Sequence, residues 1–380
     1  MKILIAPDSF KECLTAQKVV THIANGITEV IPEATLFKMP MSDGGEGILS
    51  VFIEKLGGTY VTLPVKDPLL RNVNAKYGIL PDASTAVIEM AQASGLELLK
   101  PRQRNPLITS TYGTGQLIVD ALDNGCKKII IGLGGSATND GGMGMLKALG
   151  CQFLDIEGKD IGEGGGQLHL LHTINLSQLD SRIQQTEIVV ACDVDNPLTG
   201  VNGASFVFGP QKGASYTDVH TLDFNLKHYA KILAATLPSD FSTTPGTGAA
   251  GGLGMALLAV LNGSLVSGVS LVMEALQIEA LISESDLIIT GEGKIDQQTV
   301  HGKTIAGIAA LGKKHQVPVV VITGKIENGF QKLYDNGVTS VHSIVNAPMN
   351  LEGAITSAPY LIESAVSNII RTIQPFKIKL

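Results

Sequence analysis

The 380-residue chain has no tryptophan, and aromatic residues make up only 4% of it. Its four cysteines lie far apart and form no CxxC pair, which argues against a zinc or dithiol redox site. Each cysteine borders an apolar run, where the thiol acts as a small buried hydrophobe. We therefore expect four reduced structural thiols.

Positive charge and long apolar runs are also scarce. The 28 Lys and Arg residues face 35 Asp and Glu residues, and no basic run exceeds two residues, which excludes a nucleic-acid footprint. Segment 242–273 carries no charge, but its dense apolar part, Leu253–Leu261, is far shorter than the roughly 20 residues of a membrane span. The apolar start of the chain is too short for a signal peptide. We expect a cytoplasmic protein with no nucleic-acid or membrane partner, in which Leu253–Leu261 is a buried helix.

Glycine, in contrast, is abundant. The chain has 43 glycines, about 11% of its residues, against a usual share of about 7%. They follow no three-residue period and are accompanied by only 16 prolines, which excludes collagen-like and linker-like chains. The glycines are expected in turns where the backbone approaches a ligand.

Both ends of the chain alternate strand-like and helix-like patterns. The runs KILIAP and ATLFKMP near the start, and DLIIT, VPVVVIT and SVHSIV near the end, predict five strands separated by helices. Such alternation is typical of a doubly wound parallel sheet. Helices are predicted at Thr15–Ile31, with Thr15 as a cap, and at 303–316, 327–336 and 350–372.

The middle of the chain has a different pattern. Three strand-like runs between Gly58 and Ala91 have no helix between them, which predicts an antiparallel meander. Further strands (KKIIIGL, EIVVACD) alternate with helices near 114–124 and 140–149, a hairpin-like piece is expected at NGASFVFG and a helix at Tyr216–Leu237. We predict a two-domain α/β fold, with residues 1–66 and 283–380 forming the outer domain and 67–282 an inserted mixed α/β domain.

Residues that follow the predicted outer strands carry polar and charged groups. In open α/β sheets, ligands bind beyond the carboxyl ends of the strands. These turns contain glycine, hydroxyl, carboxylate and lysine side chains, and the candidates among them are Asp8, Ser9, Lys11, Ser42, Asp43, Gly44, Gly45, Glu46, Glu292, Lys294 and Asp296.

The inserted domain repeats this pattern. Its KKIIIGL strand is followed by a glycine-rich turn that leads into a helix, an arrangement suited to anions because backbone N–H groups and the helix N-terminus converge there. The second strand, EIVVACD, leads into the carboxylates of DVDNP, and a later turn, GPQKG, holds a lysine. The candidate residues are Gly134, Gly135, Ser136, Thr138, Asn139, Asp140, Asp193, Asn196 and Lys212.

Phosphoryl transfer fits this chemistry best. It needs donors for phosphate oxygens, carboxylates for Mg²⁺ and an acceptor for the proton of the attacking hydroxyl. The turn Gly132–Ala137 also fits the G-x-G-x-x-A fingerprint of an NAD site, so a dehydrogenase stays open as an alternative. No G-x-x-x-x-G-K-[ST] motif occurs, which excludes a P-loop kinase.

Eight motifs resemble those of one known family. APDSFK, PMSDGGEG, STYGTG, GLGGSATNDGG, ACDVDNPL, FGPQKGA, GAAGGLG and TGEGKID occur in the same order and at matching spacing in the bacterial glycerate kinase family. The resemblance covers residues 3 to about 325. It implies ATP-dependent phosphorylation of D-glycerate with 2-phosphoglycerate as product. It also implies a flavodoxin-like domain interrupted by a domain of restriction-endonuclease-like fold.

Residue chemistry together with this resemblance predicts an active site in a cleft between the two domains. Asp193 is expected to orient or deprotonate the C2 hydroxyl, with Lys11 as a second catalytic residue. Lys11, Lys212 and Lys294 would offset negative charge, with Arg104 assisting. Glu292 and Asp296 would hold Mg²⁺, for which Asp43 is a further candidate, and the loops Gly134–Asp140 and Gly44–Gly47 would cradle phosphate or the glycerate carboxylate.

Three alternatives stay open from the sequence: a kinase that forms 3-phosphoglycerate, an NAD-dependent dehydrogenase, and a small-molecule sensor that keeps the kinase fold. The sequence does not assign nucleotide and glycerate to particular loops, nor does it fix the oligomeric state.

Overall fold

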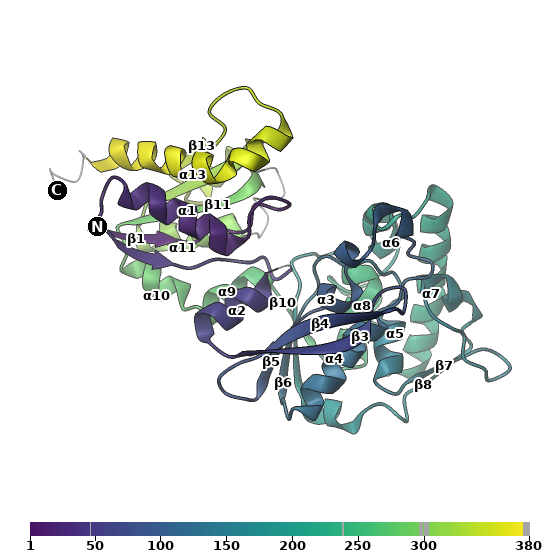
Figure 1. Ribbon diagram of the computed structural model, residues 1–380. Coiled ribbons are helices and arrows are strands. Elements are labelled where there is room, and N and C mark those ends of the chain that lie inside the picture. The colour runs from purple at the N-terminus through teal and green to yellow at the C-terminus, as the bar shows by residue number, and fades with distance from the viewer. Residues whose placement is uncertain (46, 238, 296–298, 300–303, 375–380) are drawn as a thin grey trace. The chain divides into compact units, whose positions relative to one another are not determined.

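The computed structural model describes residues 1–45, 47–237, 239–295, 299 and 304–374, and it divides into two compact units (Figure 1). Unit 1 contains Met1–Asp43 and Val269–Leu380, and unit 2 contains Gly44–Gly268. The chain therefore enters and leaves unit 2 once each, as expected for an insertion. The boundaries differ from the expected ones, 66/67 and 282/283.

Packing explains the shift of both boundaries. Strand β3 (Thr59–Lys66) pairs with β4 (Asn72–Ile79) over its whole length, so a boundary at residue 66 would cut a hairpin. At the other boundary, Gly307 lies against Val269 and Met273, which ties the segment after residue 268 to unit 1.

Unit 1 is built on a five-stranded parallel sheet, as the alternating pattern predicts. Its spatial order is β13-β12-β11-β1-β2, and each neighbouring pair is parallel. The strands are β1 (Lys2–Ile5), β2 (Thr35–Lys38), β11 (Leu287–Ile295), β12 (Val319–Ile326) and β13 (Ser340–Ser343). The helices are α1 (Ala16–Thr28), α9 (Gly268–Ala275), α10 (Ile278–Ser283), α11 (Thr304–His315), α12 (Lys332–Asp335) and α13 (Leu351–Ile373).

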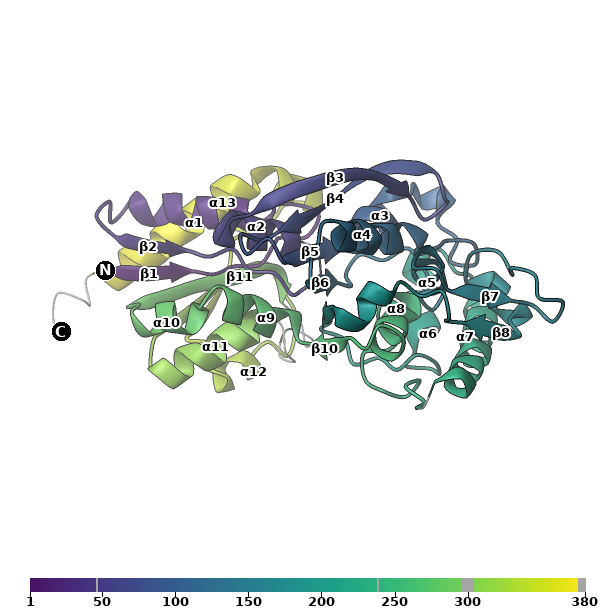
Figure 2. The same ribbon diagram turned by 90° about the horizontal axis from the view of Figure 1, so that it is seen from below.

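Helices cover both faces of this sheet (Figure 2). Successive strand side chains point to opposite faces, and Ile3 and Ile5 enter the apolar cluster formed with α1 and α13. On the other face, Ile288 lies against Gly312 of α11. Helix α1 begins where predicted, since the Thr15 hydroxyl accepts a hydrogen bond from the Lys18 N–H.

Unit 2 is built on a six-stranded mixed sheet in the order β10-β9-β6-β5-β4-β3. The predicted meander is confirmed, because β3, β4 and β5 (Thr85–Glu89) pair antiparallel. Strands β5, β6 (Lys128–Gly132), β9 (Glu187–Ala191) and β10 (Ser264–Val266) then pair in parallel. Strands β7 (Gln152–Leu154) and β8 (Thr173–Asn175) form a separate two-stranded sheet.

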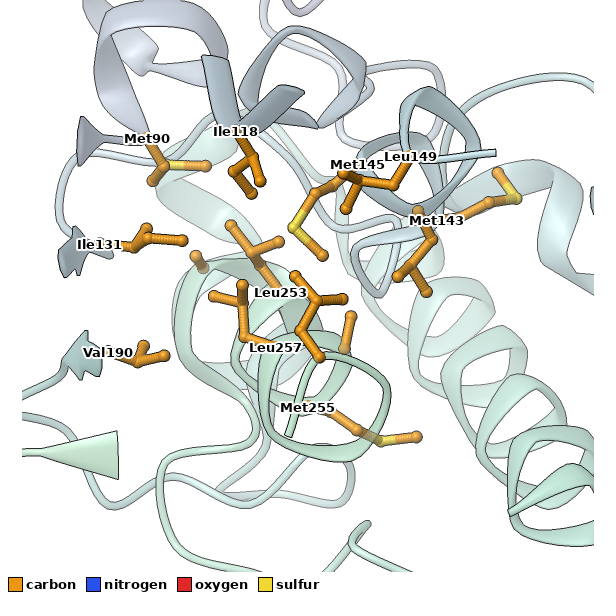
Figure 3. Close-up of a cluster of buried hydrophobic side chains, with 14 of the residues drawn as sticks. Met90, Ile118, Ile131, Met143, Met145, Leu149, Val190, Leu253, Met255 and Leu257 are labelled. Atoms are coloured by element: carbon orange, nitrogen blue, oxygen red, sulfur yellow. The ribbon is translucent and has the colours of Figure 1, made fainter. Parts of the chain in front are cut away.

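The core of unit 2 lies between this sheet and its helices (Figure 3). Ile131 and Val190 point from β6 and β9 toward Leu253 and Leu257, which confirms the predicted buried helix. The helices are α2 (Ile48–Leu56), α3 (Ala91–Ser94), α4 (Tyr112–Asp123), α5 (Met143–Ala148), α6 (Ala204–Phe208), α7 (Tyr216–Thr236) and α8 (Ala249–Ala259).

One predicted element is wrong. The run NGASFVFG, expected to be hairpin-like, forms helix α6. A short apolar run suits either a strand or a buried helical turn, and its periodicity does not separate them. Contacts with α7 and α8 determine the conformation here.

Among the described helices, none has the length and apolar character needed to cross a membrane.

Candidate active site

The main candidate site is a pocket of about 420 Å³ in unit 1. Its lining comes from residues that follow β1, from the ends of β11 and β12, from residues after β13 and from the first half of α13. These strands are parallel, so their carboxyl ends meet at one edge of the sheet, where α/β proteins bind ligands. The sequence-predicted residues Asp8, Ser9, Lys11, Asp43, Glu292 and Lys294 all line this pocket.

Asp8 is the buried carboxylate of the pocket, with 6% of its surface exposed. Its Oδ1 accepts a hydrogen bond of 2.6 Å from the Ser9 N–H, and its Oδ2 accepts one of 2.9 Å from the Thr304 hydroxyl. Burial and, to a smaller extent, the negative charge of Asp43 raise the pKa of Asp8 to about 7. A cation bound beside Asp8 would favour the ionised form of this carboxyl.

The lysines of the pocket are much more exposed. Lys11 Nζ lies 3.4 Å from Asp43 Oδ2, while Lys294 and Lys325 reach Glu327 Oε1 at 3.3 and 2.8 Å. Exposed ion pairs of this kind are weak. All three ammonium groups can therefore exchange these partners for an anionic ligand at little cost.

The other side of the pocket is apolar and was not predicted from the sequence. It is formed by Ile344 and Val345 after β13 and by Leu351, Ala354 and Ile355 of α13. Apolar residues in a predicted helix are normally assigned to the core, and these residues belong to no recognisable motif. Lys325, which follows the predicted strand VPVVVIT, was also not among the candidate residues, although it lines the pocket.

The pocket offers few carboxylates that could hold Mg²⁺. The Glu292 carboxylate accepts a hydrogen bond of 2.7 Å from Thr299 and lines the pocket together with Asp43. Within the described parts of the chain, no three His, Cys, Asp or Glu side chains gather as a metal site. Since Mg²⁺ is usually held by one or two carboxylates with phosphate oxygens and water, the donor set still fits. Asp296 and Glu46 lie outside the described residues.

In unit 2, Asp193 lies just beyond the end of β9 and is exposed. Its Oδ1 accepts a hydrogen bond of 3.0 Å from the Gly268 N–H. Gly268 is also next to Gly44: a Cβ placed on Gly44 would lie 2.5 Å from the Gly268 Cα. The two ends of unit 2 thus touch beside the predicted catalytic carboxylate.

The glycine-rich loop after β6 is largely used by the protein itself. The buried Asp140 carboxylate accepts hydrogen bonds from the Thr111 N–H and hydroxyl and from the N–H groups of Gly142 and Gly144. Burial raises the pKa of Asp140, and these hydrogen bonds oppose the rise. The N–H groups that an anion would need at the start of α5 are therefore bound to Asp140.

Lys212 also lies inside unit 2, with 1% of its surface exposed. Its Nζ donates a hydrogen bond of 2.6 Å to the Thr138 carbonyl oxygen. Burial lowers the pKa of Lys212 to about 7, while the charge of Asp140 opposes this shift. In this conformation Lys212 supports the loop rather than facing a ligand.

Buried polar atoms without a hydrogen-bond partner lie in the same region: Arg104 Nε, Thr138 Oγ1 and Asn139 Oδ1. The Arg104 backbone contacts Gly213, next to Lys212 in the chain. The Asn139 amide donates to the Ser205 hydroxyl at 3.0 Å. Buried polar groups are nearly always paired, so unpaired ones suggest a place for water or for a polar ligand.

The other predicted residues have structural contacts. Ser42 is buried. The Gly45 carbonyl oxygen lies beside Gly132, and the Gly135 carbonyl oxygen accepts a hydrogen bond from the Leu96 N–H at 2.8 Å. Ser136 forms an antiparallel bridge with Gly95, and Gly134, two residues before it, is partly exposed. The Asn196 amide donates a hydrogen bond of 2.7 Å to the Asn202 carbonyl oxygen.

Comparison with known proteins agrees with the motifs. A model of the glycerate kinase family matches residues 3–374. A glycerate kinase of Halalkalibacterium halodurans is 48% identical over 367 residues, 97% of each chain, and glycerate 2-kinase of Escherichia coli is 46% identical over 373 residues, 98% of each chain. A crystal structure from Salmonella typhimurium LT2, assigned to a glycerate kinase 2, is 44% identical with a TM-score of 0.86 and full coverage of both chains. The chain therefore belongs to the glycerate kinase family.

Proposed function

We propose that this protein phosphorylates D-glycerate with ATP and forms 2-phosphoglycerate. The observation that carries the proposal is the 46% identity, over 98% of both chains, to a protein named glycerate 2-kinase. The family match over residues 3–374 supports the same reaction class.

The unit 1 pocket has the chemistry that phosphoryl transfer needs. Its three exposed lysines can neutralise phosphate oxygens, and Asp43 and Glu292 can hold Mg²⁺ together with those oxygens. When bound, Mg²⁺ would offset the charge that develops on the transferred group. The Asp8 carboxylate would be held in position by the hydrogen bonds that it accepts from the Ser9 N–H and the Thr304 hydroxyl.

For the acceptor, we assign the residues of unit 2. Asp193 would orient or deprotonate the C2 hydroxyl, since it is exposed and its carboxylate accepts a hydrogen bond from the Gly268 N–H. The unpaired polar atoms of Arg104, Thr138 and Asn139 would bind the glycerate carboxylate and hydroxyl groups. The predicted cleft between the domains stays a prediction.

The proposal extends to the two folds. The order β2-β1-β11-β12-β13 corresponds to the 2-1-3-4-5 order of flavodoxin-like sheets. We assign unit 1 to that fold. The mixed sheet of unit 2 supports the restriction-endonuclease-like assignment that the family resemblance implies.

The test is an assay of ADP release from the full chain with ATP, Mg²⁺ and D-glycerate. Release that requires D-glycerate supports the kinase, and ³¹P and ¹³C NMR of the product should show the phosphate on C2. A phosphate on C3 would overturn the product assignment. Reduction of NAD by glycerate, without ADP release, would support the dehydrogenase alternative.

A further inference from the structure

We propose that the unit 1 pocket binds the nucleotide, and that the carbonyl oxygen of Ile355 selects adenine by accepting a hydrogen bond from its 6-amino group. This inference rests on the proposed kinase function, to which it adds the location and the base specificity of the nucleotide site.

A proline inside α13 provides the acceptor. In an α-helix the N–H of residue i bonds to the carbonyl of residue i−4. Pro359 has no N–H, so Ile355, four residues earlier, cannot receive the usual helical hydrogen bond from position 359. The Ile355 carbonyl oxygen thus lacks its usual helical donor, and Ile355 lines an otherwise apolar part of the pocket.

The Ile355 carbonyl oxygen has a weak hydrogen-bond donor beside it in the structure. The Cys13 thiol donates to the Ile355 carbonyl oxygen at 3.7 Å, and both residues line the pocket. A thiol is a poor donor. An aromatic amine is a better donor, so a bound adenine could replace the thiol at this oxygen.

The pocket has the size and polarity of a nucleotide site. Its volume of about 420 Å³ lies within the usual 300–1,000 Å³ of small-molecule sites. The apolar side formed by Val345, Ala354 and Ile355 can cover the faces of a base, whereas Lys11, Lys294 and Lys325 line the same pocket and can meet the phosphates.

The base preference follows from hydrogen-bond chemistry. Adenine carries an amine, a donor, at position 6, whereas guanine carries a carbonyl oxygen there. A carbonyl acceptor in the wall of the pocket attracts the amine and repels the oxygen. ATP is therefore favoured over GTP by the helix backbone, without a dedicated side chain.

The first experiment fills the apolar side. Ala354→Phe should weaken binding of adenosine 5′-(β,γ-imido)triphosphate with Mg²⁺ at least about tenfold by calorimetry on the full chain. The matched control is Thr356→Phe, on the exposed side of the same helix and outside the pocket lining. The control should bind as the unsubstituted chain does, and the KM for glycerate should be unchanged in both variants.

The second experiment restores the missing donor. In Pro359→Ala, the new N–H competes for the Ile355 carbonyl, so the ratio of ATP to GTP affinity should fall about fivefold, the effect of one hydrogen bond. Thermal unfolding shows whether the helix stays folded.

Each outcome decides a separate question. Unchanged nucleotide affinity in Ala354→Phe, or a higher KM for glycerate alone, would overturn the nucleotide site. An unchanged ATP to GTP ratio in Pro359→Ala would overturn the role of the Ile355 carbonyl. If the unsubstituted chain binds the analogue but phosphorylates no glycerate, the proposed function fails and the nucleotide site stands.

Discussion

The ammonium group of Lys212 donates a hydrogen bond of 2.6 Å to the carbonyl oxygen of Thr138 in the interior of unit 2. A buried cation is costly unless it is paired, and the attraction of Asp140 offsets only part of this cost, since the pKa of Lys212 is still lowered to about 7. The loop after β6 is therefore held by a group that titrates near neutral pH.

This titration predicts a pH-dependent stability. The native state releases the Lys212 proton near pH 7, whereas the unfolded chain keeps it until about pH 10.5, the ordinary lysine pKa. Between these values the unfolded state binds more protons, so stability rises with pH. The increase should approach about 1.4 kcal/mol per pH unit and should be absent in Lys212→Met. Urea unfolding at pH 7, 8 and 9 measures it.

A surface lysine supplies the control for that experiment. Lys231→Met, on the exposed side of α7, should keep the pH dependence of the unsubstituted chain. If the free energy of unfolding rises equally with pH in the unsubstituted chain and in Lys212→Met, the buried amine does not titrate in this range.

The Asp8 carboxyl predicts the opposite pH dependence. Burial and Asp43 raise its native pKa from 3.8 to about 7, so the native state binds the extra proton between these values and stability falls as pH rises. Asp8→Asn removes this loss and should stabilise the protein at pH 8 by on the order of 2 kcal/mol. Thermal unfolding at pH 8 and pH 4 measures the gain, which should nearly vanish at pH 4. An equal gain at both pH values would show that the pKa of Asp8 is not raised in the native state.

Replacement of the proposed base should affect turnover. Asp193→Asn keeps an oxygen that can accept the hydrogen bond from Gly268, but it cannot take a proton. The kcat should fall by a factor on the order of 100 or more. Asp195→Asn, two residues later and also exposed, is the control. A near-normal kcat in folded Asp193→Asn would remove this residue from the mechanism.

The contact between the ends of unit 2 predicts a specific sensitivity. Gly44 has a φ of +81°, and a Cβ at this position would lie 2.5 Å from the Gly268 Cα. Gly47, at +91°, has no atom within 4 Å of such a Cβ. Gly44→Ala therefore combines backbone strain with a clash and should cost about 2–4 kcal/mol, against about 1 kcal/mol for Gly47→Ala. Chemical denaturation of both variants separates the two effects, and equal losses would show that the contact at Gly268 adjusts.

Much of the fold is predictable from local pattern. The five outer strands, the meander and the Thr15 cap depend on short-range periodicity and on one side chain. The position of the domain boundary, predicted near residue 66, does not follow from local pattern, because it depends on the pairing of β3 with β4. The conformation of 203–209 was missed for a related reason: packing against α7 and α8 decides it.

The site is predictable only in part. Strand-end carboxylates and lysines of unit 1 do share a pocket, because parallel topology brings the ends of separate strands to one edge. Lys212 and Asp140 have the residue types of a phosphate site, yet both are buried and bonded to the protein. Sequence motifs identify a chemical group but not the direction in which it points. The spacing between Ile355 and Pro359, in contrast, was present in the sequence and becomes informative once the pocket is known.

The meeting of Gly44 and Gly268 also has an evolutionary consequence. A segment whose first and last residues touch can enter a surface loop of another protein without separating the strands on either side of that loop. Unit 2 has this property, since its ends are in van der Waals contact. The geometry of its ends is thus compatible with acquisition of unit 2 by insertion between the second and third strands of a five-stranded domain.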